Sequence, residues 1–590
     1  MSPKKKLTQP EARRPKNLSD GQRTYPANGM TIVTHQVGAL PIINGLLDRM
    51  QLREFLSSHL SLEDKRTKID TPRVVLLLIK NLLMAREPMY GVAEWARNFA
   101  PDLFDMWSDD LEHLNDDRVG RCLDRVFLAL DTSLVMDVVT HVVKVFDVRL
   151  DELHNDSTTV TFSGDHGDAQ TEQSSDGHAI PAITWGHNKD HRPDLKQLLY
   201  ILTVSDDGGI PIYFQAASGN VADDQTHQAT WKLMAELVQR PDFVYVADCK
   251  LATTANLNEI ARLGGRFITV LPATRKEDTQ FRATLRDQPD GISWREIYQL
   301  MNEDGSIRDV FRVSTNDYLS KEGYRIFWFH SRGKAESDAA TRSRRLQRAI
   351  QELTEFRARL ASSRTRFRQR EKVSAVVESI LESRGAGAML SVEIHEQQHE
   401  SFQQATRGRP NGNTQYTRHL ETRFDIRWQV NTQQLELAAT GDGVFPLITN
   451  LSDWRSQDVL QAYKRQPIIE KRFSQLKTDF HVAPIYLKSV TRIVGMLAVY
   501  FFALMLQSLL ERELRRAMDA QNVDSLPLYP EGRSCSRPTT RKVLDVFDPI
   551  TRQTLMTTGS DDFATFTTEL SPIHNTILNL LHVPSTDYHV

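Results

Sequence analysis

The chain has 590 residues, enough for about four domains of ordinary size. Hydrophobic residues make up 40% and charged residues 25%, a globular composition that excludes fibrous and wholly disordered classes. Three cysteines are too few for a disulfide framework or a cysteine zinc cluster. Because 73 Lys and Arg stand against 76 Asp and Glu, giving a net charge of −3, any binding of a polyanion requires a local concentration of positive charge.

The N-terminal residues 1–29 begin with a basic stretch, and no apolar run follows that would make a secretory signal. Residues 1–24 hold seven Lys and Arg against Glu11 and Asp20, without apolar periodicity. This composition predicts a disordered basic arm, either a solvated leader or a segment that touches phosphates.

Residues 30–147 predict an all-helical domain. Thr71 and Pro72 are typical of a helix start, because a capping residue is followed by proline in the first turn. Asn115 begins a second helix, and apolar residues recur after it at helical spacing. Such a domain in front of a second fold is either a DNA-binding head or a dimerisation and packing domain.

From residue 148 the pattern changes to alternating strands and helices. Residues 153–160 are β-rich, and 198–204 and 210–216 flank a Gly-containing turn, which predicts a hairpin. The continuous apolar run 243–247 is typical of a strand buried on both faces, and 267–271 is a further strand. The order predicts a mixed α/β sheet.

The sheet pattern occupies 148–272, stops over 273–442 and resumes over 443–526, and the C-terminal region 527–590 is weakly patterned. The interruption therefore predicts an insertion domain within an α/β core.

Within the interruption, residues 336–385 predict a helical hairpin, and 334–372 carry twelve Lys and Arg against five Asp and Glu. The densest part of this basic stretch contains Arg364, Arg366, Arg368 and Arg370. Such a run is either a solvated face or a surface for backbone phosphates.

Residues 493–510 are 18 successive residues without charge. This length is at the lower edge for a membrane span, but a helix that is apolar all round also occurs in the core of a large protein. We expect a core helix here and no membrane as partner.

Three acidic residues fall at positions that suggest a common site. Asp156 lies in or at the end of the first sheet strand, Asp248 directly follows a buried strand, and Glu470 lies in a helix after the interruption. Converging carboxylates repel one another unless cations lie between them, and hard oxygen ligands suit Mg²⁺ or Mn²⁺. Two such ions can activate a water and stabilise the leaving oxygen of an in-line displacement at phosphorus.

Tyr463, Glu470 and Lys477 repeat every seven residues and share one stripe of the predicted helix. A lysine on the same side as a catalytic acid could hold a phosphate. These residues, in the segment 463–470 followed by Lys477, resemble the tyrosine–arginine–glutamate–lysine signature of bacterial insertion-sequence DDE transposases.

Other segments resemble the same family in the same order: 114–121, 154–159, 186–197, 219–224 and 246–248. There are two departures. The position of the family's arginine is occupied by Gln466, with Arg465 one place away, and Pro467 is expected to kink the helix.

The resemblance implies an RNase H-like core interrupted by an insertion domain, with Asp156, Asp248 and Glu470 as ligands of two Mg²⁺ ions that Mn²⁺ can replace. It implies cleavage at the terminal inverted repeats of an insertion sequence and strand transfer to target DNA. The expected partners are double-stranded DNA and a second or further copy of the chain in a synaptic complex, in the bacterial cytoplasm at the nucleoid. The residues expected to contact DNA are Tyr463, Arg465, Lys477, Lys189, Arg192, Arg364, Arg366, Arg368 and Arg370.

Three alternatives remain open from the sequence. The same acids could serve a metal-dependent nuclease without strand transfer. The chain could be a DNA-binding derivative that has lost catalysis, against which the complete set of acids argues. It could also be a membrane-associated protein anchored by residues 493–510.

Overall fold

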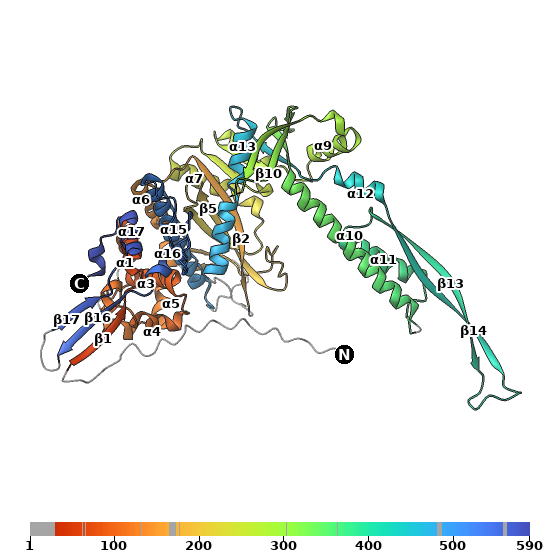
Figure 1. Cartoon of the computed structure of the whole chain (residues 1–590), viewed down its shortest axis with the longest axis horizontal. Helices are drawn as coiled ribbons and strands as arrows, with labels where there is room; N and C mark the ends of the chain where they lie inside the picture. Colours follow the sequence, from red (N-terminus) through yellow and green to blue (C-terminus); the bar gives the residue numbers. More distant parts are fainter. Residues whose placement is uncertain are drawn as a thin grey trace. The chain divides into compact units, whose positions relative to one another are not determined.

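The computed structural model describes residues 30–589 except 62, 65, 131, 164–172, 176–177, 303, 363, 481–486 and 558–562 (Figure 1). The predicted basic arm, residues 1–29, lies outside the described residues. The chain divides into two compact units: unit 1 comprises Met1–Phe267 with Ala462–Val590, and unit 2 comprises Ile268–Gln461.

The N-terminal part of unit 1 is mostly helical, as expected. Asp70 caps α3 by accepting a hydrogen bond from the Arg73 backbone N–H, and Asn115 caps α5 in the same way from Arg118. The helices are α1 Leu40–Arg49, α2 Leu52–His59, α3 Thr71–Met84, α4 Val92–Arg97, α5 Asp116–Ala129 and α6 Leu134–Phe146.

One element corrects the expectation of an all-helical domain: Met30–Gln36 forms strand β1. It pairs antiparallel with β16 (Thr551–Thr557), which in turn pairs with β17 (Phe563–Thr567). The partner of β1 lies more than 500 residues away in the chain, so local pattern alone did not reveal this strand. Helices α16 (Thr540–Phe547) and α17 (Pro572–Leu581) flank these C-terminal strands in sequence.

The central sheet of unit 1 has the strand order β6-β5-β2-β7. Its strands are β2 Glu152–Phe162, β5 Lys196–Ser205, β6 Pro211–Ser218 and β7 Val244–Ala247. β5 runs antiparallel to β2 and β6, whereas β7 runs parallel to β2, so the sheet is mixed as predicted. Helices α7 (His227–Val238) and α8 (Thr254–Arg262) follow β6 and β7 in sequence, and β3 (Gln173–Ser175) and β4 (His178–Ile180) form a short separate hairpin.

Helix α15 (Val490–Ala520) forms the apolar centre of unit 1, where it contacts α3, α5, α17 and β6. A Cβ atom at Gly495 would collide with the Leu123 carbonyl oxygen, so glycine permits the close approach of α15 to α5. Among the described residues, α15 is long and apolar enough to cross a membrane, and the bent pair α5 and α6 passes the same test together. The most apolar 18 residues of α15 are all buried in the protein, as predicted for a core helix.

Unit 2 contains a second set of strands in the order β8-β15-β12-β10-β9. Their bounds are β8 Arg266–Val270, β9 Trp294–Met301, β10 Ile307–Ser314, β12 Arg325–Ser331 and β15 Val444–Thr449, with β11 (Tyr318–Leu319) beside β12. β15 pairs antiparallel with β8, so the chain between them leaves and re-enters the fold at neighbouring strands. In the strand order, β12, β10 and β9 follow β15. Part of the expected insertion therefore forms a sheet together with β8 and β15.

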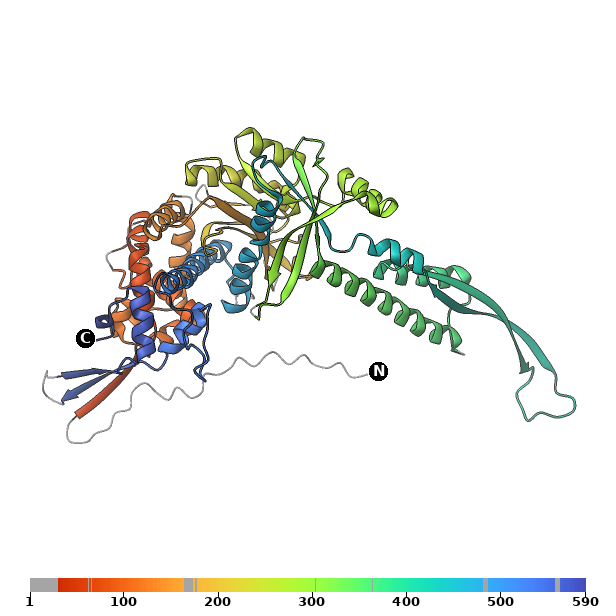
Figure 2. The ribbon, with the colours of Figure 1, turned by 45° about the horizontal axis from the view of Figure 1, so that its top comes forward.

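The remainder of that segment forms helices α10 (Arg332–Ala361) and α11 (Arg370–Arg384) and a long hairpin of β13 (Leu390–Gln404) and β14 (Tyr416–Val430). These four elements share a hydrophobic core around Leu353, Phe356, Val373 and Ile426. Helix α9 (Lys276–Asp287) precedes β9 in the chain, and α12 (Thr432–Ala439) follows β14. Figure 2 shows the β13–β14 hairpin from a second direction.

We predict that Leu497→Asp prevents folding, because Leu497 in α15 is fully buried and an unpaired buried carboxylate is costly. The measurement is the soluble yield and the circular dichroism of the purified protein. Ala520→Asp, which places the same side chain at the exposed end of α15, should remain soluble and folded. Soluble, folded Leu497→Asp protein would contradict the role of α15 as the centre of unit 1.

Candidate active site

Strand β2 brings three polar side chains to one face of the sheet. Because alternate residues of a strand point the same way, Glu152, His154 and Asp156 lie in a row along it. His154 is fully buried and Glu152 nearly so, whereas the Asp156 carboxylate keeps about a quarter of its surface exposed. The row therefore passes from a buried end to a carboxylate that is accessible to solvent.

Asp156 and Asp248 are neighbours across the parallel pair of β2 and β7. The register pairs His154 with Val246 and Asn155 with Ala247, so the next residue of each chain is one of the two aspartates. Neighbouring strands lie about 4.8 Å apart and residues in register point to the same face, so the two carboxylates are held close together. Burial, opposed by the Lys189 charge and supported by the Asp248 charge, raises the pKa of Asp156 to about 6.

Lys189, which the sequence analysis expects to contact DNA, lies inside this group of acids. Its Nζ atom donates to the Ser157 backbone oxygen and Oγ, both at 2.7 Å, and lies 3.4 Å from Asp156 Oδ1 and 3.1 Å from Asp223 Oδ2. Burial works against its charge, but Asp156 and Asp223 outweigh burial and raise the pKa of Lys189. A fixed cation therefore stands next to Asp156.

Asp223 is a member of this group that the sequence analysis did not assign to the site. It accepts a hydrogen bond from Ser157 Oγ at 2.9 Å in addition to its ion pair with Lys189. The available signal was its place in the family-like segment 219–224 that follows β6.

Glu470 lies on α14 (Pro467–Ser474), and the start of this helix is attached to β2. Arg465 binds Glu152 with two hydrogen bonds, the Nε–Oε1 bond being 2.7 Å, and Gln466 Oε1 lies 2.8 Å from His154 Nδ1. His154 Nε2 in turn bonds to Glu152 Oε1 at 2.8 Å. Burial would raise the pKa of Glu152, but these hydrogen bonds from Arg465 and His154 lower it.

The helix is broken at Pro467, as the sequence suggested. α13 (Ser456–Lys464) ends before it, and Pro467 occupies the first turn of α14, where its missing N–H costs no hydrogen bond. At the other end of α14, the fully buried Arg472 donates to the carbonyl oxygens of Gly208 (2.6 Å) and Gly209 (2.8 Å) in the turn between β5 and β6. The exposed Glu470 thus projects from a helix that is fixed at both ends.

Tyr463 is affected by the charges of all three predicted acids. Burial raises the pKa of its hydroxyl to about 12, and the charges of Asp248, Glu470 and Asp156 contribute to the rise. All three carboxylates therefore lie within electrostatic range of one phenol.

The remaining predicted residues of unit 1 lie in different surroundings. Lys477, in the π-helical turn after α14, binds Asp190 Oδ1 at 2.6 Å. The exposed Arg192 is occupied by both carboxylate oxygens of Asp194, at 2.8 and 2.7 Å. Arg465 is paired with Glu152 as described.

Of the four predicted arginines of unit 2, three lie between α10 and α11, and Arg370 is the first residue of α11. Arg368 pairs with Glu421 of β14 at 2.9 Å, and Arg370 donates to the Ile394 oxygen of β13 at 3.3 Å. Arg364 and Arg366 make no ion pair with any described residue.

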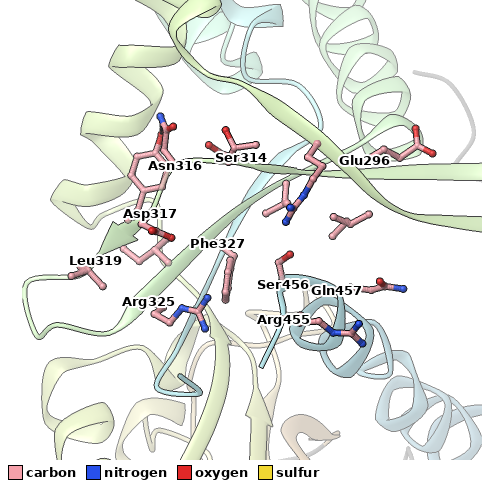
Figure 3. A pocket seen from close by; sticks show the side chains of 16 residues that line it. Glu296, Ser314, Asn316, Asp317, Leu319, Arg325, Phe327, Arg455, Ser456 and Gln457 are labelled. Atoms are coloured by element: carbon pink, nitrogen blue, oxygen red, sulfur yellow. Dashed lines mark hydrogen bonds between the residues drawn. The ribbon is translucent and has the colours of Figure 1, made fainter. Parts of the chain in front are cut away.

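A cavity of about 900 Å³ in unit 2 offers a different kind of surface (Figure 3). Arg325 at its wall donates to the carbonyl oxygens of Leu451, Ser452 and Trp454, each at 3.1 Å, and lies over the Phe327 ring. None of the predicted site residues lines this cavity, and Arg325 is already used by the fold.

Whether these acids can bind a metal ion depends on their number and on the type of donor atom that they offer. In the described part of the chain, no three His, Cys, Asp or Glu side chains are grouped closely enough to hold a metal ion together. Asp156 and Asp248 nevertheless offer two adjacent hard oxygen donors, which suit Mg²⁺, and the raised pKa of Asp156 marks a place where added positive charge is favourable.

Comparison with known protein families identifies the family of this chain. Residues 151–506, more than half of the chain, match the family model described as Transposase DDE domain, and the chain belongs to this family. Residues 32–140 match a Domain of unknown function (DUF4277). The assignment to DDE transposases made from the sequence is confirmed at this level.

No curated protein matches the chain. Among solved structures, the piggyBac transposase in its synaptic complex with hairpin DNA matches with 10% identity and a TM-score of 0.23, over 50% of this chain. The match covers 59% of the piggyBac chain, so this chain corresponds to less than two thirds of that protein.

We predict that Asp156→Asn stabilises the metal-free protein more at pH 7.5 than at pH 4.5. The pKa of Asp156 is raised in the folded state, so the unfolded chain loses this proton first, and stability falls as the pH rises from about 4 to about 6. Asparagine does not ionise and removes that loss. The measurement is the difference in Tm between variant and wild type at both pH values in EDTA, and an equal difference at both would contradict the prediction.

We also predict that Gln466→Ala destabilises the protein by about 1–3 kcal/mol, because the buried His154 loses a hydrogen-bond partner. Urea denaturation followed by circular dichroism measures the effect. Gln521→Ala, an exposed glutamine after α15, is the matched control and should change little. Equal stabilities of the two variants would show that Gln466 does not attach α14 to β2.

Proposed function

We propose that this protein is a DNA transposase that cleaves the terminal inverted repeats of an insertion sequence and joins the freed 3′ ends to target DNA. The observation that carries the proposal is the pair Asp156 and Asp248 on neighbouring parallel strands, with Glu470 on a helix attached to the same strand, in a chain of the DDE family. These three acids are the proposed catalytic residues.

The proposal includes the finer expectations from the sequence. The core is RNase H-like, interrupted by an insertion domain within 273–442, and Tyr463, Glu470 and Lys477 form a signature of the tyrosine–arginine–glutamate–lysine type. The protein originates from a bacterial insertion sequence and acts in the cytoplasm at the nucleoid. It works on double-stranded DNA as a dimer or larger assembly in the synaptic complex.

Asp156, Asp248 and Glu470 would hold two Mg²⁺ ions, for which Mn²⁺ could substitute. These ions would supply an activated water and would stabilise the leaving oxygen at phosphorus. The chain's own residues orient the reacting groups. Lys189 balances part of the charge of Asp156 and Asp223, so the two acids can remain close together. The Tyr463 hydroxyl, with its pKa raised to about 12, stays protonated at neutral pH and serves as a hydrogen-bond donor to a DNA phosphate.

Lys477 is the proposed phosphate contact beyond Glu470. Its partner Asp190 is an exposed carboxylate, and an exposed ion pair is worth about 0–1 kcal/mol, so a DNA phosphate can compete for the ammonium group. Arg465 and Gln466 act on the DNA indirectly, by fixing the start of α14 on β2.

We predict that Asp156→Asn, Asp248→Asn and Glu470→Gln each reduce DNA cleavage by several orders of magnitude, with affinity for DNA within a few-fold of wild type. The assay follows a labelled duplex carrying the end of the element, in Mg²⁺ and in Mn²⁺, with a gel shift in parallel, and EDTA should reproduce the loss. Glu436→Gln, an exposed acid on α12, is the control and should retain full activity. Normal cleavage by Glu470→Gln would remove Glu470 from the set.

The same assay separates a transposase from a nuclease and from an inactive derivative. Addition of a supercoiled target plasmid should yield joined products with wild-type protein. Cleavage without joining would identify a nuclease, and DNA binding without cleavage would identify a derivative that has lost catalysis.

A further inference from the structure

The hairpin of β13 and β14 has one face that is apolar at its base and mixed apolar and polar further out. The register is unbroken from Leu390 opposite Val430 to Gln404 opposite Tyr416, so the even-numbered residues of both strands share a face. At the base, this face packs on α10 and α11 through Leu390, Ile394 and Ile426.

The same face continues beyond the helices, over the part that we call the outer hairpin, residues 396–424. There Leu420, Phe402 and Tyr416 are 55%, 63% and 54% exposed. They stand among polar residues of the same face: Glu396, Gln398, Glu400, Gln404, Arg418 and Thr422. Both views show the hairpin running on past the ends of α10 and α11 (Figures 1 and 2). The apolar side chains that would be covered in a core are therefore presented to solvent.

The outer hairpin carries arginines that the fold does not use. The tip, residues 405–415, contains Arg407 and Arg409 and no acid, and neither arginine makes an ion pair with any described residue. By contrast, Glu400 pairs with Arg418, and Glu421 pairs with Arg368. The segment 362–370 adds four arginines and no acid alongside the hairpin, where it is attached by the bond from Arg370 to Ile394.

Seven polar side chains of the outer hairpin are amides. These are Gln397, Gln398, Gln403, Gln404, Asn411, Asn413 and Gln415. Amide side chains bind the adenine edge in the major groove, arginine binds guanine or phosphate, and apolar groups contact the thymine methyl group.

The dimensions fit a DNA groove. Nine residues of each strand in the outer hairpin span about 30 Å, close to one turn of B-DNA. Two strands about 4.8 Å apart, with their side chains, fit a major groove about 12 Å wide, which admits a two-stranded ribbon.

We propose that the outer hairpin is a DNA-binding arm that lies in the major groove of duplex DNA. Arg407 and Arg409 at the tip, with Arg364 and Arg366 beside the hairpin, bind backbone phosphates. The face with Phe402, Leu420 and Tyr416 contacts base edges and gives preference for the element's end. This inference rests on the proposed function, which it deepens by naming a surface that reads the DNA.

The test uses the full-length protein and two 40-base-pair duplexes, one with the element's end and one of unrelated sequence, titrated at several salt concentrations. The tip variant is Arg407→Ala with Arg409→Ala. The face variant is Phe402→Ser with Leu420→Ser. The control is Arg295→Ala with Arg308→Ala, two exposed arginines on β9 and β10 that lose the same charge. All substituted side chains are exposed, and unchanged Tm values verify folding.

The tip variant should bind both duplexes about tenfold more weakly and reduce the slope of log K against log[salt] by about 1–2, because each lost phosphate contact removes about 0.9. The face variant should lose about tenfold of its preference for the element's end and keep its salt slope. The control should match wild type in both respects.

Wild-type affinity and salt slope in both variants would overturn the proposal that the outer hairpin is a DNA-binding arm. The proposed transposase function would stand, since wild-type protein would still bind the ends. Absence of binding by wild type to either duplex would instead overturn the proposed function. Light scattering of the same samples tests a second copy as occupant: a smaller assembly for the face variant, with unchanged DNA affinity, would overturn the proposal in favour of a subunit interface.

Discussion

The in-register parallel pairing of β2 with β7 is the constraint on which the candidate site depends. It forces Asp156 and Asp248 together at the point where both strands leave the ladder, and their mutual repulsion has to be balanced locally. Lys189 provides part of that balance and is itself anchored by Ser157 and Asp223. The site is thus a set of charges whose spacing is imposed by backbone hydrogen bonds and whose stability depends on a neighbouring cation.

The helix that carries Glu470 is attached to the same strand through buried polar contacts. Glu152, His154 and Gln466 form one connected row, and Arg465 closes it at the surface. A glutamine is suited to this place because it can bond to a buried imidazole without bringing a charge into the core. An arginine at position 466 would have to bury its guanidinium next to His154.

Much of the site could be predicted because its residues follow local rules. Asp248 directly follows a buried apolar strand, and Pro467 marked the helix break, so both were evident from neighbouring residues. Lys189 could not be placed, because its position is fixed by contacts with Ser157 and Asp223 on two other segments. The pairing of β1 with β16 and the length of the β13–β14 hairpin depend on partners chosen in three dimensions, and single-sequence periodicity does not encode such choices.

The pairing of β1 with β16 also sets the order of events during synthesis. β1 leaves the ribosome with the first part of unit 1, but its partner begins at Thr551, and the second half of unit 1 begins only at Ala462. At synthesis rates of up to about 20 residues per second, β1 waits roughly 25 s or longer for β16. Unit 2 is contiguous and can fold during that interval. In a nascent chain, unit 2 can therefore fold before unit 1, which carries Asp156, Asp248 and Glu470, is complete. Unit 1 can complete its fold only when translation is nearly over.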